Sequence, residues 1–97
     1  MKRLQDNVTI ITGGGKGIGF GLAQAFAEEG SDLVLTGRTE SRLLTAKEEL
    51  ETRYGIRVLP IVADGADEEA IRGVVRKTIE TFGRIDTLVN NPQPYLF

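Results

Sequence analysis

Residues 12–19, Thr-Gly-Gly-Gly-Lys-Gly-Ile-Gly, stand between a short apolar run at 8–11 and a segment at 18–29 whose apolar residues recur at helical spacing. This order predicts a strand, a glycine turn and a helix. Glycine has no Cβ, so such a turn lets the backbone bend sharply, approach a phosphate closely and pack the helix against the strand. The free N–H groups at the start of the helix would then face the anion. The stretch therefore predicts a phosphate-binding turn.

The same alternation of strand and helix continues through the rest of the chain. Short apolar, often β-branched runs separate segments with helical periodicity. The expected strands are 7–12, 32–36, 56–63 and 85–89, and the expected helices are 18–29, 40–54 and 68–82. Strands that alternate with helices pair in parallel through right-handed crossovers, which predicts an α/β fold. One domain, residues 1–91, is expected, followed by an irregular tail at 92–97 that holds two prolines.

Local signals refine the third strand and the helix ends. Pro60 lies inside the expected third strand, and because proline cannot donate a ladder hydrogen bond, this strand should lie at an edge of the sheet. Thr39 and Asp67 stand where helix N-caps belong. The third helix should bury one stripe of side chains, namely Ile71, Val74, Val75, Thr78 and Phe82.

Composition excludes several kinds of function. The 97 residues allow one domain, and 12 basic against 14 acidic residues give a net charge of −2, which offers no electrostatic case for nucleic acid or an anionic membrane. The chain has no cysteine and no histidine, so disulfides, thiol chemistry, histidine bases and the usual zinc sites are impossible within it. The apolar run after the basic N-terminus is too short for a signal peptide or a membrane span, so we expect a cytoplasmic protein.

The surroundings of the glycine turn decide which phosphate ligand it suits. A glycine turn alone is a weak signal, but here it lies within a βαβ unit of about thirty residues, the context of a dinucleotide-binding fingerprint. The competing phosphate loop of nucleoside triphosphatases needs Ser or Thr after its lysine, whereas Lys16 is followed by Gly17, so no hydroxyl is available for Mg²⁺. A receiver-like or flavodoxin-like domain is a third interpretation, but the first strand lacks the aspartate cluster that a receiver needs.

The end of the second expected strand favours a phosphorylated dinucleotide. NAD-binding folds place Asp or Glu there, against the ribose 2′-hydroxyl. This chain has Gly37 and Arg38 instead, and a guanidinium suits a 2′-phosphate that a carboxylate would repel. Lys16, in the glycine turn, could approach the same phosphate. Both cations could instead be solvated surface charges; their convergence predicts NADP(H) rather than NAD(H).

Together these motifs resemble the short-chain dehydrogenase/reductase family. The resemblance runs from about residue 5 to residue 91 and rests on TGxxxGIG at 12–19, Gly37-Arg38, Asp64 and the run FGRIDTLVNN at 82–91. It implies a Rossmann-type three-layer fold, with a parallel sheet of strand order 3-2-1-4 and helices on both faces. That order puts the third strand at an edge of the sheet, in agreement with Pro60.

The resemblance also implies a set of cofactor-binding residues. The pyrophosphate and ribose would be lined by Gly13, Gly15, Lys16, Gly17, Ile18 and Gly19. Arg38 would hold the 2′-phosphate. The adenine and its ribose would be held by Asp64, Gly65, Asn90 and Asn91. From the residues alone, the alternative for Asp64 is a turn or capping carboxylate, and the alternative for the two asparagines is a polar strand end.

Two departures limit the resemblance. After Asn91 the family has Ala-Gly where this chain has Pro92 and Gln93, so the backbone path changes there. The family's catalytic Ser and Tyr-x-x-x-Lys pair would lie beyond residue 97, and Tyr54 is followed four residues later by Val58. No catalytic or metal-binding residue is therefore assigned, and without a tyrosine acid, hydride transfer to a carbonyl lacks its proton donor.

We therefore expect the cofactor-binding half of an NADP(H)-dependent oxidoreductase, truncated before its catalytic residues and inactive by itself. The alternative is a non-catalytic dinucleotide-binding or interaction module. In the implied sheet order the fourth strand has an open apolar edge at Ile85, Leu88 and Val89, which predicts self-association. No nucleic-acid or membrane partner is expected.

Overall fold

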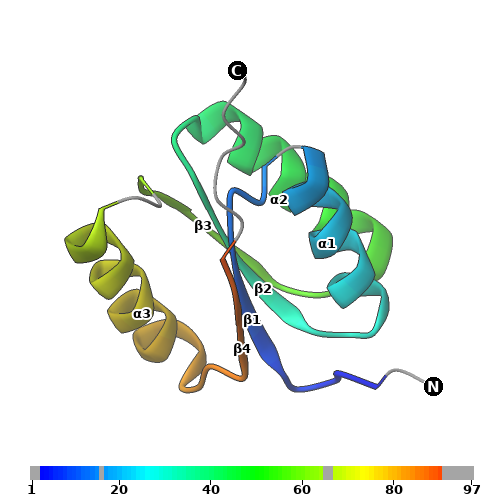
Figure 1. The fold of residues 1–97 in the computed structure, drawn as a ribbon. Coiled ribbons are helices and arrows are strands. Elements are labelled where there is room, and N and C mark those ends of the chain that lie inside the picture. The colour runs from blue at the N-terminus through cyan, green and yellow to red at the C-terminus, as the bar shows by residue number, and fades with distance from the viewer. Residues whose placement is uncertain (1–2, 16, 65–66, 91–97) are drawn as a thin grey trace.

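The structure is a computed structural model that describes residues 3–15, 17–64 and 67–90 (Figure 1). Lys16, Gly65, Asn91 and the predicted tail at 92–97 lie outside these residues. Strands and helices alternate as β1(Val8–Thr12), α1(Gly17–Glu28), β2(Asp32–Gly37), α2(Glu40–Tyr54), β3(Val58–Val62), α3(Glu68–Phe82) and β4(Thr87–Val89). Every predicted strand and helix is present, and the third and fourth strands begin slightly later than predicted. No helix of the described ranges is long and apolar enough to cross a membrane.

The four strands form one parallel sheet in the order β3-β2-β1-β4. Figure 1 shows α1 and α2 on one face of this sheet and α3 on the other. The predicted Rossmann-type three-layer fold is therefore confirmed. Pro60 lies on the edge strand β3, opposite Leu35 of β2, where a strand needs ladder partners on one side only.

The sheet is buried on both faces, and β1 and β2 supply side chains to each. The core on the side of α1 and α2 has at its centre Ile11, Leu33, Leu35, Leu43 and Leu50. The core on the side of α3 contains Val8, Ile10, Val34, Ala63 and Val74. Because successive side chains of a strand point to opposite faces, a strand that feeds two cores has to be apolar throughout.

Three local predictions concern the N-caps of α2 and α3 and the burial of one side chain of α3. Asp67 caps α3 as predicted, because its Oδ1 accepts hydrogen bonds from the N–H groups of Glu69 at 3.0 Å and Ala70 at 3.3 Å. Thr39 is the N-cap residue of α2, which confirms its predicted position, but its side chain makes no capping hydrogen bond. The burial predicted for Val75 was wrong: its side chain is 37% exposed, because no element of the described chain covers this side of α3.

A network around Asp86 fixes the start of β4 against β1. The Asp86 carboxylate accepts the N–H of Val8 at 2.8 Å and two N–H groups of the Arg84 guanidinium at 2.7 and 2.9 Å. The N–H of Asp86 donates to the carbonyl oxygen of Val8 at 2.9 Å. The hydrogen bond from Arg84, followed by that from Val8, lowers the pKa of the Asp86 carboxyl. This network sets the register of β4, and with it the position of Asn90 at the other end of the strand.

Candidate functional site

The predicted site residues gather at one edge of the sheet. All strands are parallel, so their C-terminal ends lie at the same edge. The glycine turn, Arg38, Asp64 and Asn90 follow β1, β2, β3 and β4 in that order. The chain leaves β1 toward β2 on one side and later returns to β4 on the other. Ligands of open α/β sheets bind at such a change of direction.

The glycine turn between β1 and α1 is anchored to the end of β2. The N–H groups of Gly13 and Gly14 both donate to the carbonyl oxygen of Thr36, at 2.8 and 3.1 Å. Gly13 has a φ of 69° and Gly17 a φ of 60°, a region that favours glycine. A Cβ on Gly14 would lie 2.6 Å from Cδ2 of Leu35. Sequence reasoning assigned Gly14 no role, because this constraint comes from another strand.

The start of α1 is open to solvent at the same edge. Ile18, which helical spacing grouped with the apolar residues of α1, is 76% exposed, whereas Gly19 is buried. The first N–H groups of a helix have no partner within it, and the positive end of its dipole lies there. This end of α1 is therefore suited to a phosphate.

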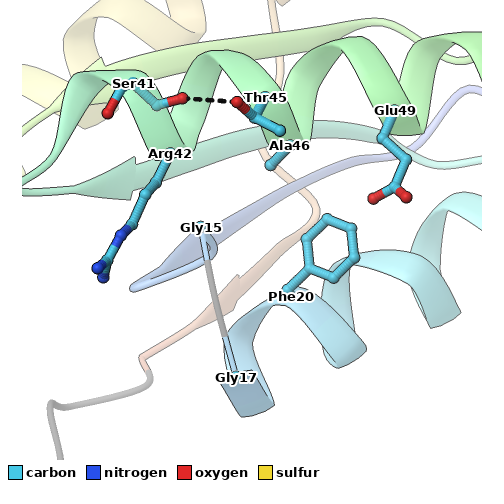
Figure 2. A pocket seen from close by; sticks show the side chains of 8 residues that line it. All are labelled: Gly15, Gly17, Phe20, Ser41, Arg42, Thr45, Ala46 and Glu49. Atoms are coloured by element: carbon cyan, nitrogen blue, oxygen red, sulfur yellow. Dashed lines mark hydrogen bonds between the residues drawn. The ribbon is translucent and has the colours of Figure 1, made fainter.

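Two cavities flank the glycine turn. The first, which we name the Arg38 cavity, has a volume of about 310 Å³ and is lined by Gly13, Gly15, Gly37, Arg38, Thr39, Arg42 and Leu43. The second, which we name the Phe20 cavity, has a volume of about 330 Å³ and is lined by Gly15, Gly17, Phe20, Ser41, Arg42, Thr45, Ala46 and Glu49 (Figure 2). Gly15 and Arg42 line both cavities. Volumes of this size lie at the lower end of the range for small-molecule sites.

Arg38 and Arg42 bring two positive charges to the Arg38 cavity. Both side chains are exposed, and within the described residues the ion pairs are formed by other cations, namely Lys47, Arg57, Arg72 and Arg84. Two guanidinium groups without a carboxylate partner, next to backbone N–H groups, suit a phosphate dianion. Sequence reasoning missed Arg42. The available signal was that Arg42 comes four residues after Arg38, in the first turn of the helix that Arg38 precedes.

Asn90 and Asp64 lie at the same edge, on opposite sides of β1 and β2. The Thr12 hydroxyl donates to Oδ1 of Asn90 at 3.0 Å and to the carbonyl oxygen of Val89 at 3.4 Å, which joins the ends of β1 and β4. Asp64 is exposed after β3, and its carbonyl oxygen accepts the N–H of Asp67 at 3.0 Å. Three further predicted site residues, Lys16, Gly65 and Asn91, lie outside the part of the chain that the structure describes.

The site supplies groups for binding an anion. Among the described residues, the ionisable side chains that line the Arg38 cavity are the two arginines. Among the residues with described positions, no group of three or more His, Cys, Asp or Glu side chains could hold a metal ion. The cavity can therefore bind and orient a phosphorylated ligand, and the described residues that line it include no general acid or base.

Comparison with known proteins identifies the family. The family model described as short chain dehydrogenase matches residues 7–92. The 12alpha-hydroxysteroid dehydrogenase of Clostridium sp. is 55% identical over 92 residues, which cover 89% of this chain and 36% of that enzyme. The peroxisomal 2,4-dienoyl-CoA reductase of Danio rerio is 42% identical over 88 residues, which cover 91% of this chain and 29% of that enzyme. The chain thus spans about a third of the length of these curated relatives.

Solved structures agree with the sequence relatives. L-sorbose reductase from Gluconobacter frateurii, complexed with NADPH and L-sorbose, has a TM-score of 0.91 and 38% identity, with 97% of this chain and 36% of that chain covered. An NAD⁺-bound xylitol dehydrogenase has a TM-score of 0.84 and 32% identity, with 90% of this chain and 33% of that chain covered. The family match over residues 7–92, on a sheet of the expected order, shows that this chain belongs to the short-chain dehydrogenase family.

Proposed function

We propose that this chain is the NADP(H)-binding part of a short-chain dehydrogenase/reductase, an oxidoreductase that transfers a hydride between NADP(H) and a carbonyl compound or secondary alcohol. Residues 1–91 would form the dinucleotide-binding unit. The bound nicotinamide would supply or accept the hydride, and the residues of this chain would bind and orient the cofactor. The observation that carries the proposal is the Arg38 cavity, where the glycine turn meets two guanidinium groups that no carboxylate within the described residues neutralises.

The residues of the site fit a dinucleotide. The turn presents Gly13 and Gly15 to the Arg38 cavity, and a Cβ on Gly15 would occupy space 3.5 Å from Cβ of Arg42. The N–H of Gly13 already donates to the carbonyl oxygen of Thr36, so glycine here would let a pyrophosphate approach the turn closely, and the N–H groups at the start of α1 would bind it. In the proposed roles, the pyrophosphate and its ribose are held by Gly13, Gly15, Lys16, Gly17, Ile18 and Gly19. The adenine and its ribose are held by Asp64, Gly65, Asn90 and Asn91.

The proposed preference for NADP(H) depends on Arg38. This residue directly follows β2 and lines the cavity beside the glycine turn. A carboxylate at this place would favour the ribose 2′-hydroxyl, whereas a guanidinium favours a 2′-phosphate. Proteins of the same fold hold either NADPH or NAD⁺, so the preference has to come from the residues of this chain.

We also propose that residues 1–97 bind the cofactor without turning it over. Val58 stands four residues after Tyr54, and Tyr95 is followed by only two residues, so these 97 residues contain no Tyr-x-x-x-Lys pair. A tyrosine with its pKa lowered by a nearby lysine is the expected proton donor for the reduced carbonyl. Incubation of the chain with NADPH and a panel of ketones should therefore give no loss of NADPH absorbance.

Calorimetric titration with NADPH and NADH tests the proposed cofactor. We expect NADPH to bind at least about 10-fold more tightly, because charge-assisted hydrogen bonds contribute about 1.5–3 kcal/mol. Arg38→Ala should remove most of this difference and leave the NADH affinity nearly unchanged. The control variant Arg72→Ala removes an exposed arginine that pairs with Glu68 on α3, and it should change neither affinity. Equal affinities, a preference for NADH, or no binding of either dinucleotide would contradict the proposal.

A second copy of the chain is the proposed partner of the outer edge of β4. Within the described sheet β4 pairs only with β1, and Leu88 is 52% exposed. An unpaired strand edge with apolar side chains is a template for pairing with another chain.

The cytoplasmic location stays a prediction from the sequence, and one of the relatives is a peroxisomal enzyme.

A further inference from the structure

Arg42 occupies an electrostatically costly position. It lies in the first turn of α2, where the helix dipole is positive, and four residues after another cation, Arg38. Glu40 is the acidic residue of this turn, and among the described residues no ion pair joins it to Arg42. Thr39 at the N-cap accepts no hydrogen bond through its side chain, so the first N–H groups of α2 add to the positive potential. The ion pairs among the described residues do not include Arg42. An anion in the Arg38 cavity would offset these positive charges together.

The packing of α2 places Arg42 at the glycine turn. A Cβ on Gly15 would lie 3.5 Å from Cβ of Arg42, and both residues line the Arg38 cavity. Arg42 also lines the Phe20 cavity, but Figure 2 shows its side chain extending away from Phe20 and Glu49. Glu49 lies about two helical turns further along α2, so it does not neutralise the guanidinium.

We propose that Arg42 recognises the 2′-phosphate of NADP(H) together with Arg38 and so helps to set the cofactor preference. The inference rests on the proposed function, because it names a further specificity-determining residue of the same site. A 2′-phosphate carries up to two negative charges on three oxygens. Two guanidinium groups that approach from the end of β2 and from the first turn of α2 can each donate paired N–H groups to it.

Two fragments of the cofactor isolate the contribution of the 2′-phosphate. Adenosine 2′,5′-bisphosphate carries this group and adenosine 5′-monophosphate does not, and calorimetric titration of the chain gives an affinity for each. Arg42→Ala should weaken binding of the bisphosphate about 5- to 20-fold, the range expected for one charge-assisted contact. The affinity for the monophosphate should stay within about twofold, because the lost contact is specific to the 2′-phosphate.

One further variant separates the charge of Arg42 from its packing, and a second variant on the same helix is a control. Arg42→Gln keeps most of the side-chain stem but loses the charge, and it should show the same selective loss as Arg42→Ala. Arg53→Ala is the matched control on the same helix, since the Arg53 guanidinium lies over the Tyr54 ring at 5.5 Å from its centroid and the residue does not line the Arg38 cavity. It should change neither affinity.

The outcomes distinguish the inference from the proposed function. If Arg38→Ala selectively weakens the bisphosphate and neither Arg42 variant does so, the inference is wrong and the proposed function stands. If both Arg42 variants weaken the two fragments equally, the role of Arg42 is structural and the inference is again wrong. If the unmodified chain binds the two fragments with equal affinity, both the inference and the proposed NADP(H) preference are wrong.

Discussion

At the scale of single residues, Gly14 has tightly packed surroundings within the glycine turn. A Cβ on it would lie 2.6 Å from Cδ2 of Leu35, 3.3 Å from Cβ of Leu35 and 3.4 Å from the carbonyl oxygen of Ile11. Leu35 is fully buried in the core, so it has little room to move. Gly14→Ala should therefore lower the free energy of unfolding by about 1–3 kcal/mol, as measured by urea denaturation.

Gly73→Ala, in α3, is the matched control for this substitution. Among the described residues, no atom outside its own helix backbone and chain neighbours lies within 4 Å of the Cβ position of Gly73. Because alanine is better than glycine in a helix by about 0.8–1 kcal/mol, this variant should be as stable as the unmodified chain or more so. An equal loss of stability in the two variants would show that contact with Leu35 is not what constrains Gly14.

The Asp86 carboxylate makes part of the stability depend on pH. Hydrogen bonds from Arg84 and Val8 lower the pKa of Asp86 in the folded chain, below the unfolded value of about 3.9. Its contribution is therefore complete above that value and is lost as the pH falls through the lowered folded pKa. Asp86→Asn should lower the midpoint of thermal unfolding at neutral pH, and its difference from the unmodified chain should shrink below about pH 4. A difference that stays constant down to about pH 2 would contradict this assignment.

The order of the expected elements was enough to select Arg38 as a site residue, because it directly follows β2. That order did not predict the roles of Gly14 and Arg42, because these depend on distances between elements. Gly14 is constrained by Leu35 of β2, and Arg42 is placed at the cavity by the packing of α2 on Gly15. The hydrogen bond between Thr12 and Asn90 likewise exists only once β4 pairs with β1.

At the scale of the elements, α2 and α3 offer a matched pair of helix N-termini. The Asp67 side chain accepts two backbone N–H groups of α3, whereas the Thr39 side chain accepts none from α2. Asp67→Ala should therefore cost about 0.5–2 kcal/mol of stability, and Thr39→Ala should cost markedly less. Chemical denaturation of both variants gives the comparison, and a larger cost for Thr39→Ala would contradict it.

The strands and helices could be predicted because each carries its own periodicity and ends at glycine or polar residues. The hydrogen bonds of side chains at the helix ends, and the burial of side chains beside a buried stripe, could not be predicted. Thr39 has the right residue type for a cap, but capping also needs the hydroxyl to point at the first turn. Val75 lies next to the buried stripe of α3, and its burial depends on whether another element covers that flank.

At the scale of the whole molecule, the alternation of elements and Pro60 predicted a parallel sheet with β3 at an edge, and the family resemblance supplied the full strand order. That order leaves β4 as the other edge. We therefore expect the chain to self-associate at high concentration in analytical ultracentrifugation. Leu88→Lys should shift it toward the monomer, because a charge on an edge strand opposes pairing.

Leu44→Lys is the control for the prediction at β4. Leu44 lies on α2 and is 48% exposed, close to the 52% of Leu88. This variant adds the same charge far from β4, so it should self-associate like the unmodified chain. If the unmodified chain is a clean monomer at high concentration, the proposed association through β4 is wrong.

A backbone amide NMR titration with NADPH tests most directly whether the chain binds a dinucleotide at its glycine turn. The N–H signals of Gly13, Gly15 and Gly17 should shift as NADPH is added, because these residues lie at the proposed pyrophosphate site. The signals of Gly55 and Gly83, which end α2 and α3 at the opposite edge of the sheet, should stay in place. Shifts that leave the glycine turn unaffected, or no shifts at all, would contradict dinucleotide binding at this turn.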